Sequence, residues 1–226
     1  LQVPFMAGSS MAVGLRTPEI TVPLPCDIES AVGIGYSGLD IYGSHALEFF
    51  QCHVERRRGA ETGVKSVQAL EGEALWKTVD NGRVPRDVLD AALAAVPHQS
   101  GDVRQAKNST LFLIEYRDGL RGAVFMLPEY AGGTSIGLKL KRESRILATR
   151  FDERSEPRHP HFAHLLKGIE RMIHTGRPSY PVERTLIVSG ALESCLQSRK
   201  AGGKKLETPH LAVRYQGTKT PQHARG

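Results

Sequence analysis

Apolar residues recur along this chain with two periods. Several segments place them three or four positions apart, which is the spacing of one helix face. In the first, Leu47, Phe50 and Val54 form such a stripe, and Gly59 follows as the residue that ends the helix. Gly176 ends another stripe in the same way. The pattern predicts helices at residues 43–58, 88–96, 160–175 and 181–199.

Other segments favour strands. Residues 111–116 and 120–126 are rich in apolar and β-branched side chains. Asp118 and Gly119 lie between them, and Asp-Gly is a favoured hairpin turn. The pattern predicts strands at residues 3–7, 64–70, 111–116, 120–126, 135–140, 146–151 and 211–215.

The order of these elements predicts the fold class. Antiparallel hairpins are grouped in the middle of the chain, and helices lie before and after them rather than in strict alternation. We therefore expect an α+β fold, with an open, mainly antiparallel sheet and helices packed on one face. Residues 3–7 have the pattern of a buried strand with no preceding element to pair with, which favours the rear part of a longer protein. The polar residues 216–226 predict a disordered tail.

The composition is that of a globular protein, since 40% of the 226 residues are apolar and 24% are charged. No segment reaches the ~18–20 consecutive apolar residues of a membrane span, and the first residues lack the features of a signal peptide. Cys26, Cys52 and Cys195 are odd in number and far apart, which favours a reducing compartment. We expect a cytoplasmic protein with no membrane partner.

The net charge of +6 would suit an anionic partner. The basic residues are nevertheless dispersed among acids, as in residues 139–145, and no recognition helix or aromatic platform accompanies them. We therefore expect no nucleic-acid partner. A basic surface that binds nucleic acid in a salt-dependent way remains the minor alternative.

Residues 33–38, with the sequence Gly-Ile-Gly-Tyr-Ser-Gly, match the G-x-G-x-x-G dinucleotide fingerprint. Glu55 and Glu61 follow at about the expected ~20 residues. However, Gly43 delays the predicted helix, and the chain lacks the alternating βαβ units that follow a true fingerprint. We favour a glycine-rich strand end, with a phosphate loop as the alternative.

His45, Glu48 and Cys52 lie at positions i, i+3 and i+7 of the first predicted helix, so they share one face. A histidine at a helix start can shuttle protons near neutral pH. The alternatives are a histidine bonded to the backbone and a His–Glu pair that only fixes packing. A metal site would need a ligand spacing that these residues lack.

Three further histidines, His159, His161 and His164, surround the start of another helix. No fourth ligand of known spacing is near, so a polar helix start is favoured over zinc, and we expect no metal site. Glu183 and Arg184 lie in the first turn of the last helix, either as a cap in which Arg184 bridges to a carboxylate or as a polar anchor. Hydrolase and kinase motifs are absent from the sequence.

Six stretches together resemble the C-terminal part of one family, the glucose-fructose oxidoreductase, inositol dehydrogenase and MocA (Gfo/Idh/MocA) group, in a bacterial branch. The similarity extends from residue 1 to about residue 215. The stretches that carry it are residues 3–10, 43–48, 54–63, 116–119, 176–185 and 206–209.

The resemblance implies a two-domain protein with an N-terminal Rossmann domain that binds NAD or NADP. Residues 1–15 would then be the last strand of that missing domain and a connector, and residues 16–215 the substrate and oligomerisation domain. Residues 33–38 would belong to the first strand of its sheet. No cofactor is expected for this chain alone, and a homo-oligomer through the sheet is expected.

The resemblance also implies the site. The family places an Asp four residues before a His that accepts the proton of the substrate hydroxyl. His45 matches the His, whereas the Asp position falls on Ile41, between Asp40 and Tyr42. The expected catalytic residue is His45, and the expected substrate-binding residues are Ser9, Ser10, Arg16, Asp40, Tyr42 and Glu48.

The function that follows is the substrate-binding part of an NAD(P)-dependent oxidoreductase acting on a hydroxyl of a sugar or polyol-like molecule. Without a cofactor domain, this chain alone is not expected to transfer hydride. The alternative is a non-catalytic binding or oligomerisation module, a truncated relic of the family.

Overall fold

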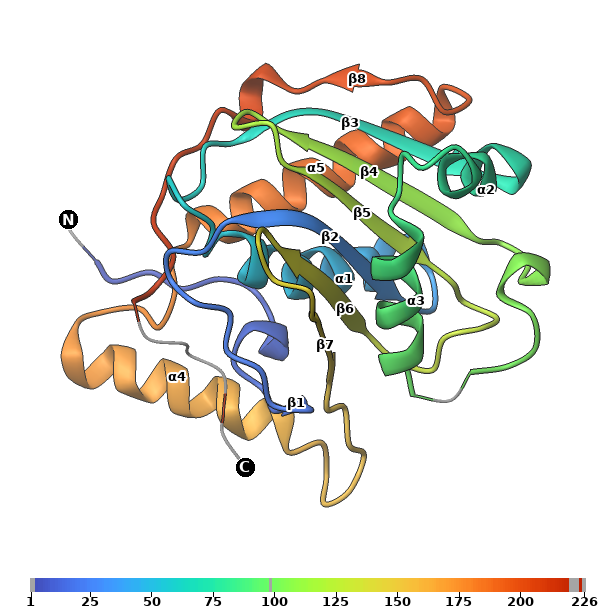
Figure 1. Ribbon diagram of the computed structural model, residues 1–226. Helices are drawn as coiled ribbons and strands as arrows, with labels where there is room; N and C mark the ends of the chain where they lie inside the picture. Colours follow the sequence, from blue (N-terminus) through green and yellow to red (C-terminus); the bar gives the residue numbers. More distant parts are fainter. Residues whose placement is uncertain (1–2, 98, 220–223, 225–226) are drawn as a thin grey trace.

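A single mixed sheet collects the strands of the described residues. The computed structural model describes residues 3–97, 99–219 and 224. The strands lie in the order β1-β7-β6-β2-β5-β4-β3-β8, and all neighbours are antiparallel except β2 and β5 (Figure 1). Their bounds are Arg16–Thr17 (β1), Ile28–Gly35 (β2), Val64–Glu71 (β3), Thr110–Tyr116 (β4), Arg121–Met126 (β5), Ser135–Leu140 (β6), Ile146–Phe151 (β7) and Leu206–Glu207 (β8).

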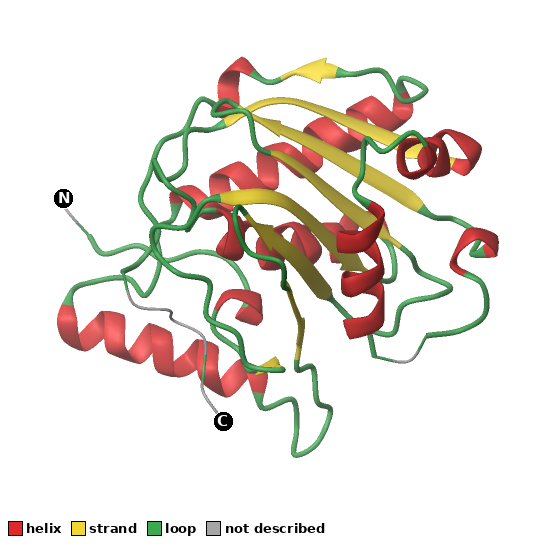
Figure 2. Cartoon of the chain, in the orientation of Figure 1, coloured by secondary structure: helices red, strands yellow, loops and turns green. Residues whose placement is uncertain are grey.

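Helices cover both faces of this sheet. The long helices α1 (Leu39–Val54) and α5 (Glu183–Lys200) pack on one face, and the short helices α2 (Gly72–Asp80) and α3 (Arg86–Ala95) lie on the other (Figures 1 and 2). Successive side chains of a strand point to opposite faces, so Ala31 of β2 joins the core under α1 while Val32 joins the core under α3. The α+β class and the open, mainly antiparallel sheet are confirmed. Helices were expected on one face of the sheet, and α1 and α5 form that layer. Helices α2 and α3 form a second layer on the opposite face, which was not expected from the sequence.

Helix α4 (His161–Thr175) lies apart from these layers, beside the short 3₁₀ turn at Ser10–Ala12 (Figure 1). Phe162, Leu166 and Ile173 on its outer side are exposed by 54%, 64% and 72%. No helix in the described part of the chain is long and apolar enough to cross a membrane.

Helix α1 begins earlier than the sequence pattern predicted. It starts at Leu39 and continues through Gly43 without interruption. A glycine inside a helix costs about 1 kcal/mol relative to alanine, so it needs a reason. A Cβ at Gly43 would lie only 2.9 Å from Leu192 Cδ1 of α5, so this glycine lets the two helices approach closely. The expectation that Gly43 delays the helix is wrong because the packing contact outweighs its weak helix propensity.

Two strands that the pattern predicted near the chain ends, at residues 3–7 and 211–215, are absent from the described structure. Residues 3–7 form no strand here, and Val3 and Phe5 are exposed by 68% and 61%. Residues 211–215 form no strand either; the 3₁₀ turn at Pro209–Leu211 precedes an irregular segment that bridges only at Tyr215 to Glu61.

Part of the expected tail is held in place. Arg56 Nη1 donates to the Thr218 carbonyl at 2.9 Å, and the Ala224 amide donates to the Val13 carbonyl at 2.8 Å. Within the tail expected to be disordered, residues 216–219 and 224 are described and make these contacts, while residues 220–223, 225 and 226 lie outside the described residues.

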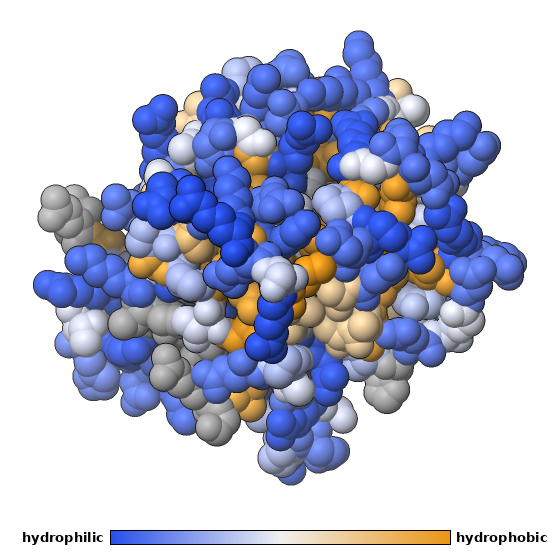
Figure 3. Space-filling view, viewed as in Figure 1, coloured by the Kyte–Doolittle hydropathy of each residue, from blue (hydrophilic) through white to orange (hydrophobic). Residues whose placement is uncertain are grey.

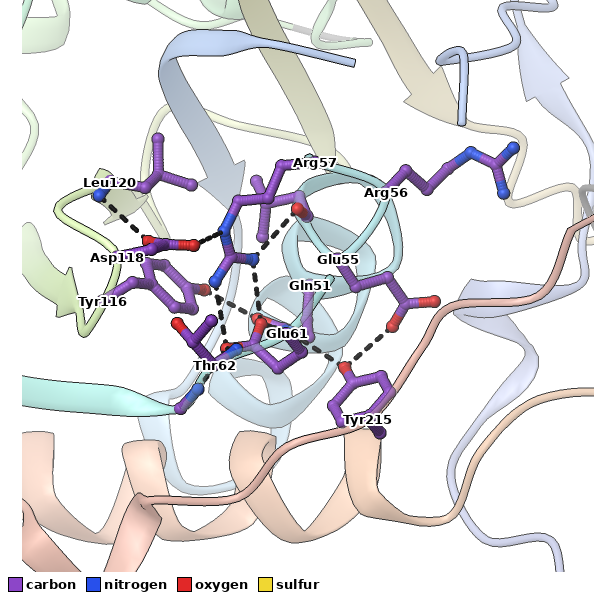
Figure 4. A network of polar contacts seen from close by, with 12 residues as sticks. Gln51, Glu55, Arg56, Arg57, Glu61, Thr62, Tyr116, Asp118, Leu120 and Tyr215 are labelled. Carbon is purple, nitrogen blue, oxygen red and sulfur yellow. Dashed lines mark hydrogen bonds and ion pairs between the residues drawn. The ribbon is translucent and has the colours of Figure 1, made fainter. Parts of the chain in front are cut away.

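A buried polar network joins the C-terminal end of α1 to its surroundings (Figure 4). The carboxylate of Glu61, whose side chain is fully buried, accepts from Arg57 Nη1 and Nη2 at 2.9 and 3.0 Å and from Gln51 Nε2 at 2.6 Å. It also accepts from the backbone amides of Thr62 and Gly63. Although burial disfavours the charge of Arg57, the hydrogen bonds to Glu61 raise the pKa of its guanidinium.

The same network reaches the C-terminal segment and α5. Gln51 Nε2 donates to Tyr215 Oη at 3.0 Å, and that hydroxyl donates to Glu55 Oε2 at 2.8 Å. Arg184 completes it with two hydrogen bonds to Glu55, at 2.5 and 2.7 Å. The prediction that Arg184 bridges to a carboxylate is confirmed.

Replacing Glu61 with Ala should lower the free energy of unfolding by about 3–5 kcal/mol, because it removes the buried acceptor that Arg57, Gln51 and two backbone amides share and leaves Arg57 with its ion pair to Asp118. The matched control is Glu73→Ala, which breaks the i,i+4 pair of Glu73 with Lys77, whose side chains are 82% and 66% exposed. This control should change stability by about 0–1 kcal/mol. Urea denaturation of both variants measures the difference, and equal losses would contradict the role given to Glu61.

Candidate active site at the start of helix α1

The connection from β2 to α1 places the candidate site at one edge of the sheet. A Cβ at Gly35 would lie 2.6 Å from Ala46 Cβ of α1 and 2.6 Å from Met126 Sδ of β5. The glycine therefore serves close packing of α1 on the sheet. Gly33 pairs with Val124 of β5 and with Ile136 of β6, so it lies within the sheet.

This geometry does not fit a dinucleotide. In a phosphate-binding fingerprint the glycines lie in the turn, where free amides meet the pyrophosphate. Here Gly33 and Gly35 both belong to β2, and only Gly38 lies in the turn, at the N-cap of α1. Residues 33–38 are thus a glycine-rich strand end, as favoured from the sequence, although the helix starts directly after them.

Two tyrosines, a histidine and a glutamate gather where α1 begins. The ring of Tyr36 lies 4.8 Å from that of Tyr42, and the ring of Tyr42 lies 5.8 Å from that of His45, edge-on. The Tyr36 hydroxyl donates to Glu153 Oε2 at 2.5 Å. Glu153 follows β7, so the cluster combines α1 with the far end of another strand.

The protonation states of this cluster follow from its burial. His45 is half-buried, and the loss of solvation lowers the pKa of its imidazole, while the negative charge of Glu153 opposes that shift. Burial and the nearby Glu153 both raise the pKa of Tyr36. At neutral pH the histidine is therefore a neutral base, while the Tyr36 phenol keeps its proton and donates a hydrogen bond to Glu153.

Ser9 and Glu48 meet one turn further along α1. The Ser9 amide donates to both Glu48 oxygens at 3.1 and 3.0 Å, and the Ser9 hydroxyl donates to Oε2 at 2.5 Å. Glu48 is only 4% exposed, and burial raises the pKa of its carboxyl, although the Ser9 hydrogen bonds oppose this. This pair of residues links the N-terminal segment to α1, and both oxygens of Glu48 accept hydrogen bonds from Ser9.

Arg16 lies deeper still. Its Nη2 donates to Cys52 Sγ at 3.4 Å, and its guanidinium lies 5.7 Å from the centre of the Phe49 ring. Its Nε finds no acceptor among the described residues, and burial lowers the pKa of the group. Burial likewise raises the pKa of the Cys52 thiol. Arg16 therefore packs inside the protein.

The structure separates the seven expected site residues into three pairs and the single Asp40. His45 and Tyr42 lie together and half-buried, Ser9 and Glu48 bond each other, and Ser10 and Arg16 are buried. Asp40 is exposed in the first turn of α1, where a carboxylate complements the helix dipole.

Sequence reasoning missed Tyr36 and Glu153. Tyr36 lies inside the glycine-rich motif and directly before α1, which is a usable signal. No sequence spacing links Glu153 to His45, because the loop that carries Glu153 comes near α1 only once the sheet has folded.

Two of the histidines around the start of α4, His159 and His161, lie against aromatic side chains. His161 is buried, with its ring 5.8 Å from that of Phe151 and 4.4 Å from that of Phe162. Throughout the described ranges, no three His, Cys, Asp or Glu side chains come together in a way that could hold a metal ion.

Comparison with known proteins shows the fold shared by this chain. No family model and no curated protein matches the sequence. Among solved structures, GenD2 from gentamicin A biosynthesis, in complex with NAD, matches with a TM-score of 0.50 and 15% identity over 80% of this chain and 56% of its own. The likeness to GenD2 shows a common fold, which confirms the fold expected from the resemblance.

Two further structures match less well. The scyllo-inositol dehydrogenase from Lactobacillus casei, with bound NAD(H) and scyllo-inositol, has a TM-score of 0.49 and 10% identity over 80% of this chain and 56% of its own. The myo-inositol dehydrogenase from Corynebacterium glutamicum has a TM-score of 0.46 and 12% identity, with the same coverage of 80% and 56%. This chain thus spans little more than half the length of these three proteins.

We expect the imidazole of His45 to titrate below the usual pKa of 6.5 in the folded chain, because burial disfavours its charged form. As the pH falls, the unfolded chain binds this proton first. The free energy of unfolding should therefore decrease as the pH falls below about 6.5, until His45 is also protonated in the folded state.

NMR of the histidine ring signals measures this pKa directly. His45→Asn should keep the fold and remove this part of the pH dependence. A His45 pKa at or above the usual value would show that burial does not outweigh the opposing charge of Glu153, and it would contradict this prediction.

Proposed function

We propose that this chain is the substrate-binding part of an NAD(P)-dependent oxidoreductase that acts on a hydroxyl of a sugar or polyol-like molecule. The observation that carries the proposal is the neutral, half-buried His45 at the start of α1, in a fold shared with GenD2, which was solved with NAD. The substrate class and the family come from the sequence resemblance.

In this proposal the chain performs the proton half of the reaction. His45 accepts the proton of the substrate hydroxyl, and the Tyr36 and Tyr42 phenols beside it offer hydrogen bonds to neighbouring hydroxyls. Four further residues are assigned to holding α1 in place rather than to contacting the substrate. They are Ser9, Ser10, Arg16 and Glu48.

In this proposal the cofactor binds to a different domain. Because Gly33 and Gly35 belong to strand β2, the glycine motif does not form the turn that binds a pyrophosphate. We therefore propose that residues 16–215 form the substrate and oligomerisation domain, that residues 1–15 connect it to a nucleotide-binding domain, and that this chain alone does not transfer hydride. The outer side of α4, where Phe162, Leu166 and Ile173 are exposed, together with Val3 and Phe5, is an apolar surface suited to such a neighbour.

A second candidate is a non-catalytic oligomerisation module. Helices α2 and α3 cover only part of their sheet face, and Figure 3 shows apolar side chains gathered in its middle. A shallow hollow lies on this face, with Leu113 and Ala123 in its floor and Arg83, Arg121 and Lys205 among its polar lining. Such a face favours association with a second copy through the sheet.

Titration calorimetry and NMR separate the two candidates. We expect myo-inositol or a hexose to bind with a Kd of about 1 mM and to shift the ring signals of His45 and Tyr42. We expect neither NAD nor NADP to bind the chain. His45→Ala should abolish the response of the neighbouring Tyr42 and leave the fold intact.

Two outcomes would overturn the assignment. A polyol that binds without moving the His45 and Tyr42 signals would place the substrate elsewhere. Micromolar binding of NAD would show that the chain holds the cofactor after all.

Association through the open sheet face is tested by mass. Light scattering should show a dimer or a larger assembly, and Arg121→Glu, which changes an exposed charge of the hollow, should shift it toward monomer. Arg158→Glu, an exposed arginine outside this hollow, is the matched control and should leave the mass unchanged. A monomeric wild-type chain would reject the oligomerisation role and leave the catalytic proposal standing.

A further inference from the structure

We propose that Glu153, on the loop that follows β7, is the positioning carboxylate of the His45 site and that Tyr36 holds it there. The inference rests on the proposed role of His45 as the base, and it assigns the acidic partner of that base to a part of the chain far from α1 in sequence.

The start of the Glu153 loop is fixed by its neighbours. The ring of Phe151, the last residue of β7, lies 6.0 Å from that of Phe49 in α1, edge-on. Phe151 also pairs with Arg16 of β1, and the Asp152 amide donates to the Leu15 carbonyl at 3.0 Å. These contacts anchor the chain immediately before Glu153 against α1 and β1.

Tyr36 then sets the direction of the Glu153 side chain. Its hydroxyl donates to Glu153 Oε2, and its ring packs at a tilt of 56° against that of Tyr42, which in turn packs against His45. A chain of contacts thus leads from the carboxylate to the imidazole. A general base is efficient when a further group orients it or stabilises its protonated form, and a carboxylate does both.

The charge of Glu153 is available for this task. The neighbouring Arg154 is engaged with Asp152, its Nη2 lying 2.5 Å from Asp152 Oδ2. Glu153 is the charged group that acts on His45, and it also acts on His161 of α4. His159 and His164 act on His161 in the opposite sense. A proton accepted by His45 is therefore stabilised by the negative charge of Glu153, which favours the charged form of the imidazole.

The acids of α1 near His45 do not act on its charge. Glu48 is buried and bonded to Ser9, and Asp40 lies exposed in the first turn of the helix. Glu153 is also exposed, but its charge is the one that acts on His45. The acidic function next to His45 therefore comes from the sheet side of the site, where Tyr36 and the β7 loop meet.

An NMR titration of the histidine ring signals in the purified chain tests this proposal. We expect Glu153→Gln to lower the pKa of His45, because the opposing negative charge is lost, and to lower that of His161 as well. Tyr36→Phe frees the carboxylate and should lower the pKa of His45 by a smaller amount. Asp40→Asn is the matched control and should leave the pKa of His45 unchanged.

The amide spectrum of each variant confirms that it is folded. An unchanged His45 pKa in folded Glu153→Gln overturns the proposal, and a shift in Asp40→Asn instead would assign the role to the helix. Since the readout needs no substrate, it is independent of the polyol titration. A His45 shift without polyol binding would retain the Glu153 assignment and reject the proposed function.

Discussion

The carboxylate of Glu61 is the point on which much of this structure depends. It gathers the guanidinium of Arg57, the amide of Gln51 and two backbone amides in a place without solvent. Through Gln51 and Tyr215 the same network reaches Glu55 and Arg184 of α5. One end of α1 is thereby fixed against the hairpin, the C-terminal segment and α5, and the rigid helix carries that placement to its other end, where His45 lies.

Local patterns were sufficient for strands β3 to β7 and for most of the long helices. The Asp-Gly turn and its flanking apolar segments predicted β4 and β5, and the stripe that contains Leu47, Phe50 and Val54 predicted most of α1. The start of α1 was misplaced because Gly43 has a poor helix propensity, and its packing against Leu192 is a tertiary contact that no local pattern shows. Residues 72–80 were likewise missed, because α2 is a short helix that follows β3 without a turn signal.

The candidate site was also predictable only in part. His45 was found because it belongs to a helix start, and Glu48 because it shares that helix face. Their environments were not predictable, since Glu48 is buried against Ser9 while His45 remains half-exposed beside Tyr36. Glu153 could not be found at all from the sequence, because the distance between it and His45 is set by the sheet order and by the packing of Phe151 on Phe49.

The central place of β2 has a consequence for how the chain folds. Val32 of β2 pairs with Ala123 on one side and with Gly137 on the other, so both neighbours of this early strand are made much later. Loop closure over such separations is slow, and β2 must wait for the β4–β5 hairpin before it gains a partner. Since α1 packs on β2, the helix that carries His45 gains its complete place on the sheet only after β5 and β6 have been synthesised, well after α1 itself.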